Sequence, residues 1–417
     1  MAASGKKIFY GWWNVATGFV GMGLSYAMFT VFAFGTFVRP LQEEFGWTRG
    51  ELSFAYTMAN IAVVIASPCL GILIDRFGVR RILIPSIILM GFTVASMALL
   101  TNNIWHYYAL YFLIPLLGAG TLPQSYSRVL IAWFNRRRGI ALGISLAGFG
   151  VGGALVPVIS QFTIESFGWR IAYIGFACSV FVLALPMALF VLREKPEDLG
   201  LLADGDAPVS ESAGKSTASL AETGLSGREA AKTISYWLIL VSFLLVGLSL
   251  TGILAHLVPM LIDRGVSAQT AAFCMTSIGI GIIFGRIFAG YLMDYFFAPY
   301  VTAFFLSGMT LGIVILATGT TSSFVFLAAV LVGMGTGSEV SEIAYICSRY
   351  FGRKAFGLIY GIMFSAFQLG ASFGAPLMGF YHDKAGDYIG ALWFLAGMAL
   401  LGAILISLLK PYPQLQT

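Results

Sequence analysis

The segment Gly71-Ile72-Leu73-Ile74-Asp75-Arg76-Phe77 has a counterpart 219 residues further along the chain, Gly290-Tyr291-Leu292-Met293-Asp294-Tyr295-Phe296. The same spacing relates Pro40, Glu44, Gly46 and Thr48 to Pro259, Asp263, Gly265 and Ser267. Further on, Phe134-Asn135-Arg136-Arg137, Gly139 and Gly143 match Phe351-Gly352-Arg353-Lys354, Gly357 and Gly361. Two similar apolar halves are typical of membrane carriers, in which one half moves against the other around a central site.

The composition predicts a chain that lies mostly within a membrane. Of its 417 residues, 58% are hydrophobic and 10% are charged, whereas a soluble domain carries about 25% charged residues. A helix needs about 20 apolar residues to cross a bilayer. Such stretches predict an all-α membrane protein of twelve transmembrane helices in two pseudo-symmetric six-helix bundles, at residues 11–37, 52–74, 82–101, 105–131, 139–164, 169–192, 234–260, 268–293, 299–319, 323–348, 355–380 and 388–409.

Lys and Arg residues are distributed unevenly between the two sides of these segments. With the N-terminus in the cytoplasm, 17 of them lie inside and 5 outside. This asymmetry predicts a multi-pass protein of the plasma (inner) membrane with both termini in the cytoplasm. It also explains the formal charge of +5 without a nucleic-acid partner. The long polar stretch 193–232 predicts a cytoplasmic linker between an N-terminal bundle (1–192) and a C-terminal bundle (233–417).

Several kinds of chemistry are not indicated by the sequence. The four cysteines fall inside predicted spans without paired spacing, which indicates packing residues: Cys69, Cys178, Cys274 and Cys347. The first apolar segment is too long for a cleavable signal peptide. The sequence has no P-loop, metal-ligand cluster or recognisable Ser/His/Asp set. We therefore expect a monomeric protein that is not an enzyme and holds no cofactor or metal, and ATP-driven transport is disfavoured.

The segment Gly71-Ile72-Leu73-Ile74-Asp75-Arg76-Phe77-Gly78-Val79-Arg80-Arg81 resembles the cytoplasmic loop motif between helices two and three of the major facilitator superfamily. Its glycines allow close helix approach, its acid can bind helix N-termini, and its arginines can form charge pairs. The second copy keeps the glycine and the acid but lacks the basic residues. The resemblance implies alternating access and a cytoplasmic gate formed by Asp75, Arg76, Arg81 and Asp294.

A narrower resemblance is to the monocarboxylate porters and the oxalate–formate antiporter-like branch. It rests on Tyr10-Gly11-Trp12-Trp13, on Trp133-Phe134-Asn135-Arg136-Arg137-Arg138-Gly139 and on Gly285-Arg286-Ile287-Phe288-Ala289-Gly290. It implies that Arg286 binds substrate, and that His256 lies near it. Two positions depart from the mammalian pattern: an acid is replaced by Ile282, and a lysine of helix one falls in Phe32-Ala33-Phe34. The proton-handling scheme of those relatives therefore cannot be transferred.

Five ionisable residues fall inside predicted spans: Arg128, His256, Arg286, Glu339 and Glu342. Each costs roughly 2.5–3.5 kcal/mol to insert, so each is expected to face a cavity or a partner. Arg286 could clamp a carboxylate through its planar guanidinium, or it could form a structural ion pair with Glu339 or Glu342. Arg128 could bind substrate or lock to Glu342. His256 could contact substrate or simply pack.

Glu339 and Glu342 lie three residues apart, on one face of the predicted helix ten. Two carboxylates this close resist double ionisation, which suits a proton carrier. Pairing with the two arginines would instead neutralise the cavity without proton traffic. Other residues that could line the cavity are Gln124, Tyr126, Tyr26, Phe29, Thr30, Gln368 and Phe364.

The sequence therefore predicts a secondary transporter of a small organic anion, for which a monocarboxylate is the leading class, by proton symport or anion exchange. The implied partners are a small carboxylate substrate, a co-transported proton in the symport case, and the lipid bilayer. The alternative within transport is a carrier of a neutral or cationic compound, in which the arginines are structural. A non-transporting membrane sensor is disfavoured, because residues 193–232 are too short and polar to form a signalling domain.

Overall fold

The computed structural model describes residues 9–205, 224–319 and 323–413, and the regular elements within these ranges are helices. The first helix group covers residues 11–191. It consists of α1 (Gly11–Gly23), η1 (Met28–Phe32), α2 (Phe34–Phe45), α3 (Arg49–Phe77), α4 (Val79–Ser96), η2 (Met97–Leu99), α5 (Ile104–Leu117), η3 (Gly118–Thr121), α6 (Pro123–Trp133), α7 (Arg138–Phe167), α8 (Trp169–Ser179), η4 (Val180–Ala184) and η5 (Met187–Val191).

The second helix group covers residues 234–407. It consists of α10 (Ile234–Asp263), α11 (Ala268–Tyr295), α12 (Ala298–Ala317), α13 (Phe324–Phe351), α14 (Phe356–Ala385) and α15 (Ile389–Ser407). Three short elements lie between the groups: η6 (Pro196–Leu199), η7 (Ala203–Gly205) and α9 (Gly227–Ala231). The central part of the predicted linker, residues 206–223, lies outside the described residues, as do the chain ends at 1–8 and 414–417.

Eleven helical segments of the described chain are long and apolar enough to cross a membrane, and they match eleven of the twelve predicted spans. The remaining prediction, 105–131, corresponds to α5, η3 and α6. This span is interrupted because Gly118–Thr121 winds as a 3-10 helix and Pro123 starts a new helix at its first turn. The predicted first span, 11–37, is also interrupted: α1 ends at Gly23 and the π-helix η1 precedes α2.

The internal repeat has a clear structural meaning at two helix boundaries. Gly46 and Gly265, which are 219 residues apart, both have positive φ (72° and 82°), a conformation that glycine adopts without strain after a helix end. Two residues later, the side chain of Thr48 accepts a hydrogen bond from the Glu51 amide at the start of α3. Ser267 does the same for the Thr270 amide at the start of α11. The repeated residues therefore end one helix and begin the next.

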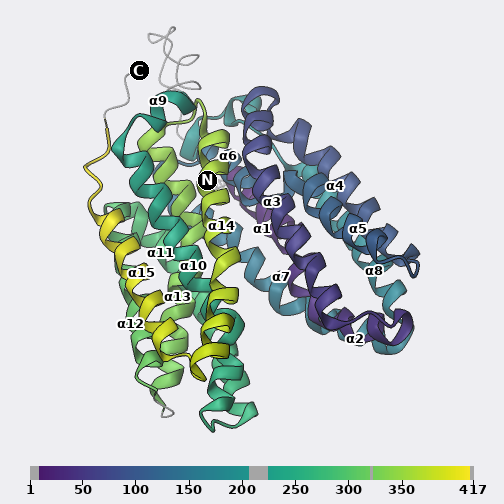
Figure 1. The fold of residues 1–417 in the computed structure, drawn as a ribbon. Coiled ribbons are helices and arrows are strands. Elements are labelled where there is room, and N and C mark those ends of the chain that lie inside the picture. The colour runs from purple at the N-terminus through teal and green to yellow at the C-terminus, as the bar shows by residue number, and fades with distance from the viewer. Residues whose placement is uncertain (1–8, 206–223, 320–322, 414–417) are drawn as a thin grey trace, which may run out of the picture.

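The two helix groups lie side by side, with the second group to the left and the first to the right in Figure 1. They meet along two helix pairs: α3 packs against α14, and α7 packs against α11. These pairs are related by the repeat, since α3 corresponds to α11 and α7 to α14. The contact between the groups is therefore itself pseudo-symmetric.

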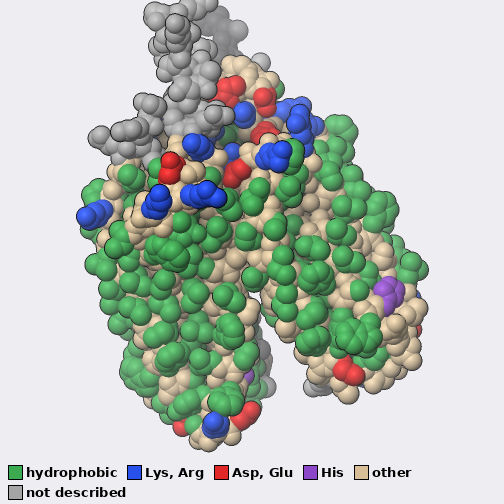
Figure 2. Space-filling model, turned by 45° about the horizontal axis from the view of Figure 1, so that its top comes forward, with side chains coloured by type: hydrophobic (Ala, Val, Ile, Leu, Met, Phe, Trp, Pro, Cys, Tyr) green, Lys and Arg blue, Asp and Glu red, His purple; other side chains and the backbone are tan. Residues whose placement is uncertain are grey.

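Large apolar side chains cover the flanks of the molecule. Phe92, Val158, Phe190, Phe304 and Phe380 are all more than 60% exposed, and Figure 2 shows hydrophobic side chains over both flanks. Exposure on this scale would be costly in water but suits contact with lipid. The chain is an integral, multi-pass membrane protein.

The two ends of the molecule differ. Charged side chains gather at the upper end in Figure 2, where the chain turns at residues 78, 134–137, 192–195 and 352–355; we call this the basic end. The opposite end carries the turns at residues 46–48, 168, 264–267 and 386–388, and we call it the open end. Figure 2 shows a cleft that separates the two helix groups at the open end.

Candidate functional site

Asp75 joins the two helix groups at the basic end. Its carboxylate accepts hydrogen bonds from the amides of Gly357 (3.0 Å) and Leu358 (2.9 Å), in the first turn of α14. It also forms a 2.8 Å ion pair with Arg128 of α6. The first amides of a helix have no partner within the helix and carry partial positive charge, so a carboxylate stabilises them. Asp75 therefore fastens the end of α3 to the beginning of α14.

Asp294, the repeat counterpart of Asp75, makes the mirror-image contact. Its carboxylate accepts hydrogen bonds from the amides of Gly139 (2.6 Å) and Ile140 (3.0 Å), in the first turn of α7. Its location at the end of α11 means that this contact again crosses from one group to the other. We refer to the Asp75 and Asp294 contacts together as the carboxylate latches.

Glycines let the backbones approach closely enough for these latches to form. A Cβ atom placed on Gly71 would lie closer than 3.0 Å to the carbonyl oxygen of Gly357, and the reverse is also true. The repeat-related pair Gly139 and Gly290 shows the same mutual contact. The expectation that the glycines of the Gly71–Arg81 motif allow close helix approach is confirmed at Gly71.

Further bonds between the groups close the basic end. Arg128 Nη1 donates to the carbonyl of Arg353 (2.6 Å), and Arg138 Nη1 donates to Ser348 Oγ (3.0 Å). Arg349 donates to both the side chain and the carbonyl of Asn135. Burial lowers the pKa of the Arg353 guanidinium, and the positive charge of Arg128 lowers it further. The structure is thus closed at the basic end and separated at the open end.

The other two predicted gate residues do not join the groups. Arg76 and Arg81 are exposed, and the Arg76 guanidinium lies 5.2 Å from the ring of its neighbour Phe77. Arg128 is paired with Asp75 rather than with Glu342, the partner that the sequence suggested. The reason is that Arg128, in the middle of α6, lies at the level of the Asp75 latch.

The latches predict a measurable conformational effect. Replacing Asp75 or Asp294 with asparagine should shift the protein toward a state that is open at the basic end. The shift should correspond to about 1 kcal/mol for Asp294→Asn, a roughly 5-fold change in population, and to more for Asp75→Asn, which also leaves Arg128 without its ion pair. Spin-label distances between Arg137→Cys and Lys354→Cys would report it, with the exposed Asp383→Asn as the control. Equal distance distributions in all variants would contradict the latch role.

Arg286 lies where three helices from both groups meet. It is 3% exposed, and its Nε donates to the carbonyl of Gly337 on α13 (2.7 Å). Its Nη1 donates to the carbonyl of Leu146 on α7 (2.7 Å), across the boundary between the groups. A guanidinium has five N–H donors, so these two bonds leave further donors for an anion. The repeat counterpart of Arg286 is Ser67, which donates to the carbonyl of Gly361 across the other helix pair.

Glu339 and Glu342 are both buried in α13. Glu339 interacts electrostatically with Arg286, although the two form no ion pair within 4.0 Å, and its Oε2 has no hydrogen-bond partner. Glu342 is fully buried, and neither of its oxygens has a hydrogen-bond partner. Of the two carboxyl groups, Glu339 is therefore the one that is electrostatically coupled to the arginine.

A buried tyrosine that the sequence reasoning missed belongs to the same group of residues. Tyr360 of α14 interacts electrostatically with Arg286, Glu339 and Tyr26, and its hydroxyl has no hydrogen-bond partner. It lies one helical turn from Phe364, and their rings stack at 6.0 Å. In the sequence, Tyr360 lies within a hydrophobic segment and cannot be distinguished from a tyrosine that only packs against its neighbours. The term central group is used here for Arg286, Glu339, Tyr360 and Tyr26.

The remaining predicted lining residues occupy different places. Gln124 is fully buried and exchanges hydrogen bonds with Ser67 (2.8 and 3.0 Å). Tyr126 is buried against Gly18 and Gly21 of α1. The ring of Phe29 lies 5.2 Å from that of Phe176 in a tilted arrangement, Thr30 donates to the Tyr26 carbonyl, and Gln368 is partly exposed.

His256 lies apart from the central group. Its Nε2 is 3.0 Å from the carbonyl of Ala375 on α14, and its ring lies 5.4 Å from that of Tyr388. These contacts join α10 to the outer part of α14, within the second helix group.

The fold and the site are those of a multi-pass membrane transporter. The helices cross the membrane, a cleft opens at one end, and the buried Arg286 guanidinium lies between the two helix groups that the carboxylate latches join. The family model of the Major Facilitator Superfamily matches residues 18–372 and 257–417. The chain belongs to the major facilitator superfamily, whose members transport solutes and are not enzymes.

Similar proteins include Monocarboxylate transporter 11 of Homo sapiens, which is 26% identical over 411 residues, covering 95% of this chain and 81% of the relative. Another is the uncharacterized MFS-type transporter YhjX of Escherichia coli, which is 23% identical, with 83% of each chain covered. Among solved structures, the proton:xylose symporter XylE has a TM-score of 0.73 at 16% identity, covering 97% of this chain and 96% of its own. The fucose transporter FucP, in an outward conformation, has a TM-score of 0.70 at 17% identity, covering 94% and 97%. These structural similarities establish the fold alone.

Proposed function

We propose that this protein is a secondary active transporter of a small organic anion of the monocarboxylate class, and that it works by alternating access. The observation that carries the proposal is the buried Arg286 guanidinium, which reaches from the second helix group to the first. A planar guanidinium with unused donors suits a carboxylate, and a dry site strengthens that pair. The similarity to monocarboxylate transporters supports the same class of substrate.

In this proposal the molecule has twelve spans, with α5, η3 and α6 together forming the fourth. Residues 1–192 and 233–417 act as the two six-helix bundles, and residues 193–232 link them. The basic end faces the cytoplasm of the cell, since it carries most of the arginines. The structure then corresponds to the outward-open state, with the carboxylate latches closing the cytoplasmic side.

Proton coupling would run through Glu339. When Glu339 is ionised, Arg286 would stabilise its negative charge, and an anion that binds Arg286 would compete with that interaction. Binding of a proton to Glu339 removes the competition, so anion and proton would bind together. Because Arg286 is 3% exposed, the surrounding helices must shift before an anion reaches it.

A carrier of a neutral compound is the second candidate. Both bonds of Arg286 go to backbone carbonyls, an arrangement that also serves a purely structural role. In the first candidate Arg286 binds the anionic substrate, whereas in the second it has a structural role and the substrate is neutral.

Uptake into liposomes that contain the purified protein tests the proposal. Labelled lactate, pyruvate, oxalate and formate would be offered under an inward proton gradient, and separately with internal unlabelled anion. Symport predicts that the proton gradient drives accumulation of the labelled anion. Glu339→Gln should abolish this accumulation while anion exchange persists. Glu342→Gln, three residues further along α13, serves as the matched control. Transport of none of these acids, with uptake of a neutral solute instead, would favour the second candidate.

A further inference from the structure

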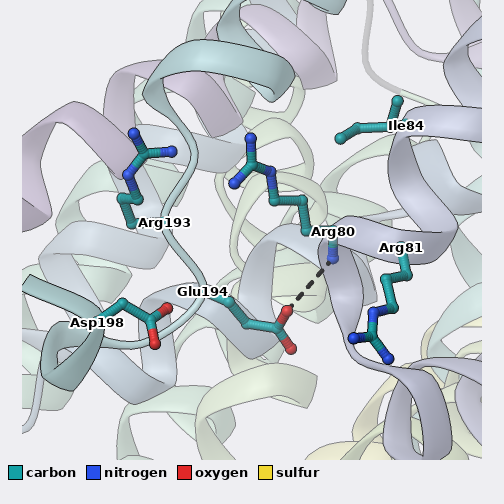
Figure 3. A pocket seen from close by; sticks show the side chains of 6 residues that line it. All are labelled: Arg80, Arg81, Ile84, Arg193, Glu194 and Asp198. Atoms are coloured by element: carbon teal, nitrogen blue, oxygen red, sulfur yellow. Dashed lines mark hydrogen bonds between the residues drawn. The ribbon is translucent and has the colours of Figure 1, made fainter.

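A cavity of about 420 Å³ lies at the basic end, outside the boundary between the helix groups. It is formed by the start of α4 and by the chain that follows η5, and it is lined by Arg80, Arg81, Ile84, Arg193, Glu194 and Asp198. Its volume lies within the range of about 300–1,000 Å³ that is typical of small-molecule sites. Figure 3 shows the side chains that surround it.

The two carboxylates of the cavity are already bound to backbone amides. Glu194 accepts hydrogen bonds from Val79 (2.9 Å) and Arg80 (3.5 Å) at the start of α4, and Figure 3 shows the second of these bonds. Asp198 accepts one from the amide of Lys195 (3.3 Å). No ion pair joins either acid to an arginine of the cavity, all of whose residues the structure describes. The helix start is therefore occupied, and three arginine charges face two carboxylates.

The arginines are held in place but not saturated. Arg80 donates through Nη2 to the carbonyl of Leu189, and Arg193 donates through Nη1 to the carbonyl of Leu192. The backbone of Arg193 is fixed on both sides, since its amide donates to Asn14 Oδ1 (3.0 Å) and its carbonyl accepts from Trp133 Nε1 (2.8 Å). Each guanidinium keeps further N–H donors. In Figure 3, Arg80 and Arg193 extend in the same direction, while Arg81 extends in the opposite direction.

Apolar side chains are exposed on the two elements that lead from the cavity into the membrane region. Along α4 and the η4–η5 segment, Leu89, Phe92, Val182 and Phe190 are 45–72% exposed. The two segments pack against each other, with the rings of Phe92 and Phe181 5.2 Å apart. A molecule whose charged part entered the cavity would therefore find an apolar surface for hydrocarbon chains beside it.

We propose that this cavity binds the phosphate group of an anionic phospholipid. Arginine binds phosphate oxygens bidentately, and basic pockets at the ends of membrane helices suit anionic headgroups. Arginines that served only to orient the protein in the membrane would not need to gather around one hollow in the surface. A free phosphate ion has the same chemistry, but it would make no use of the adjoining apolar surface.

Native mass spectrometry of the full-length protein in detergent would test the proposal, with phosphatidylglycerol, phosphatidylcholine and inorganic phosphate as separate probes. We expect retention of phosphatidylglycerol in preference to phosphatidylcholine. The double variant Arg80→Gln with Arg193→Gln should weaken it by roughly 10- to 30-fold. The control Arg228→Gln with Lys232→Gln removes two charges from the α9 region and should leave retention unchanged.

The outcomes are distinguishable even if the double variant folds poorly. Arg81→Gln, whose exposed side chain makes no hydrogen bond in the described structure, should then give a smaller loss of phosphatidylglycerol binding with an unchanged melting temperature. Equal loss in the α9 control, or equal retention of both lipids, would overturn the proposal. If inorganic phosphate displaces phosphatidylglycerol, the site recognises phosphate without acyl chains. That result would contradict a phospholipid as the ligand of the cavity.

Discussion

Replacing Arg286 with lysine should lower the rate of anion uptake by roughly 30-fold or more. Lysine keeps the positive charge but loses the planar fork that can hold two oxygens of a carboxylate while also bonding the carbonyls of Gly337 and Leu146. Loss of one partner from a buried, hydrogen-bonded charge pair costs about 2–5 kcal/mol, and 2 kcal/mol corresponds to a factor of roughly 30. Initial rates in liposomes, measured over a range of substrate concentrations, would show the effect in the apparent KM.

A structural arginine would behave differently. In that case Arg286→Lys should lower the melting temperature but leave the KM of the surviving protein unchanged. The exposed Arg39→Lys at the open end is the matched control, since it makes the same arginine-to-lysine change away from the site. Normal transport by Arg286→Lys would refute the clamp role, whatever the substrate proves to be.

Replacing Gly290 with alanine should prevent the basic end from closing and reduce transport by at least about 10-fold. A Cβ atom on Gly290 would lie closer than 3.0 Å to the carbonyl oxygen of Gly139, a distance that real Cβ atoms do not tolerate. Both partners are helix backbone, so no side chain can move aside to relieve the contact. Separation of α11 from α7 at this point would also pull Asp294 away from the amides of Gly139 and Ile140. Carriers that cannot close one side cannot complete the cycle.

The same helix provides a matched control. A Cβ atom on Gly279 of α11 would meet no atom within 4 Å, so Gly279→Ala should transport normally. Both substitutions improve helix propensity equally, which leaves the contact with Gly139 as the difference between them. Spin-label distances across the basic end should lengthen in Gly290→Ala alone. Normal closure and transport in that variant would show that the glycine contact does not limit the cycle.

Much of the fold could be predicted because each helix that crosses a membrane must satisfy its own backbone hydrogen bonds and present apolar side chains to lipid. This local requirement is visible in composition, and eleven predicted spans match long apolar helices. The repeat also has a structural meaning that the structure revealed, since Gly46 and Gly265 occupy equivalent positive-φ positions. Breaks such as that at Gly118–Thr121 were missed, because a 3-10 turn within an apolar run leaves the hydropathy unchanged.

The site was predicted less completely. The sequence singled out Arg286, because a charge inside an apolar span is conspicuous, and it singled out Asp75 and Asp294, because they recur in the repeat. It gave no signal for Tyr360, whose electrostatic interaction with Arg286 and Glu339 depends on how separate helices pack. It did not indicate Asp75 as the partner of Arg128, because depth along separate helices does not determine which residues face one another.

By itself, the sequence determined that this chain crosses a membrane many times, that its halves repeat, and which charged residues must find partners in an apolar environment. These properties follow from the transfer cost of each residue and from helical geometry, which act locally along the chain. Only the tertiary structure decided that Asp75 and Asp294 bind helix starts in the opposite group, that Arg286 reaches across to Leu146, and that three arginines surround a cavity at the basic end. Such contacts depend on how separate helices rotate and approach one another, and that arrangement is set by packing between residues far apart in the chain.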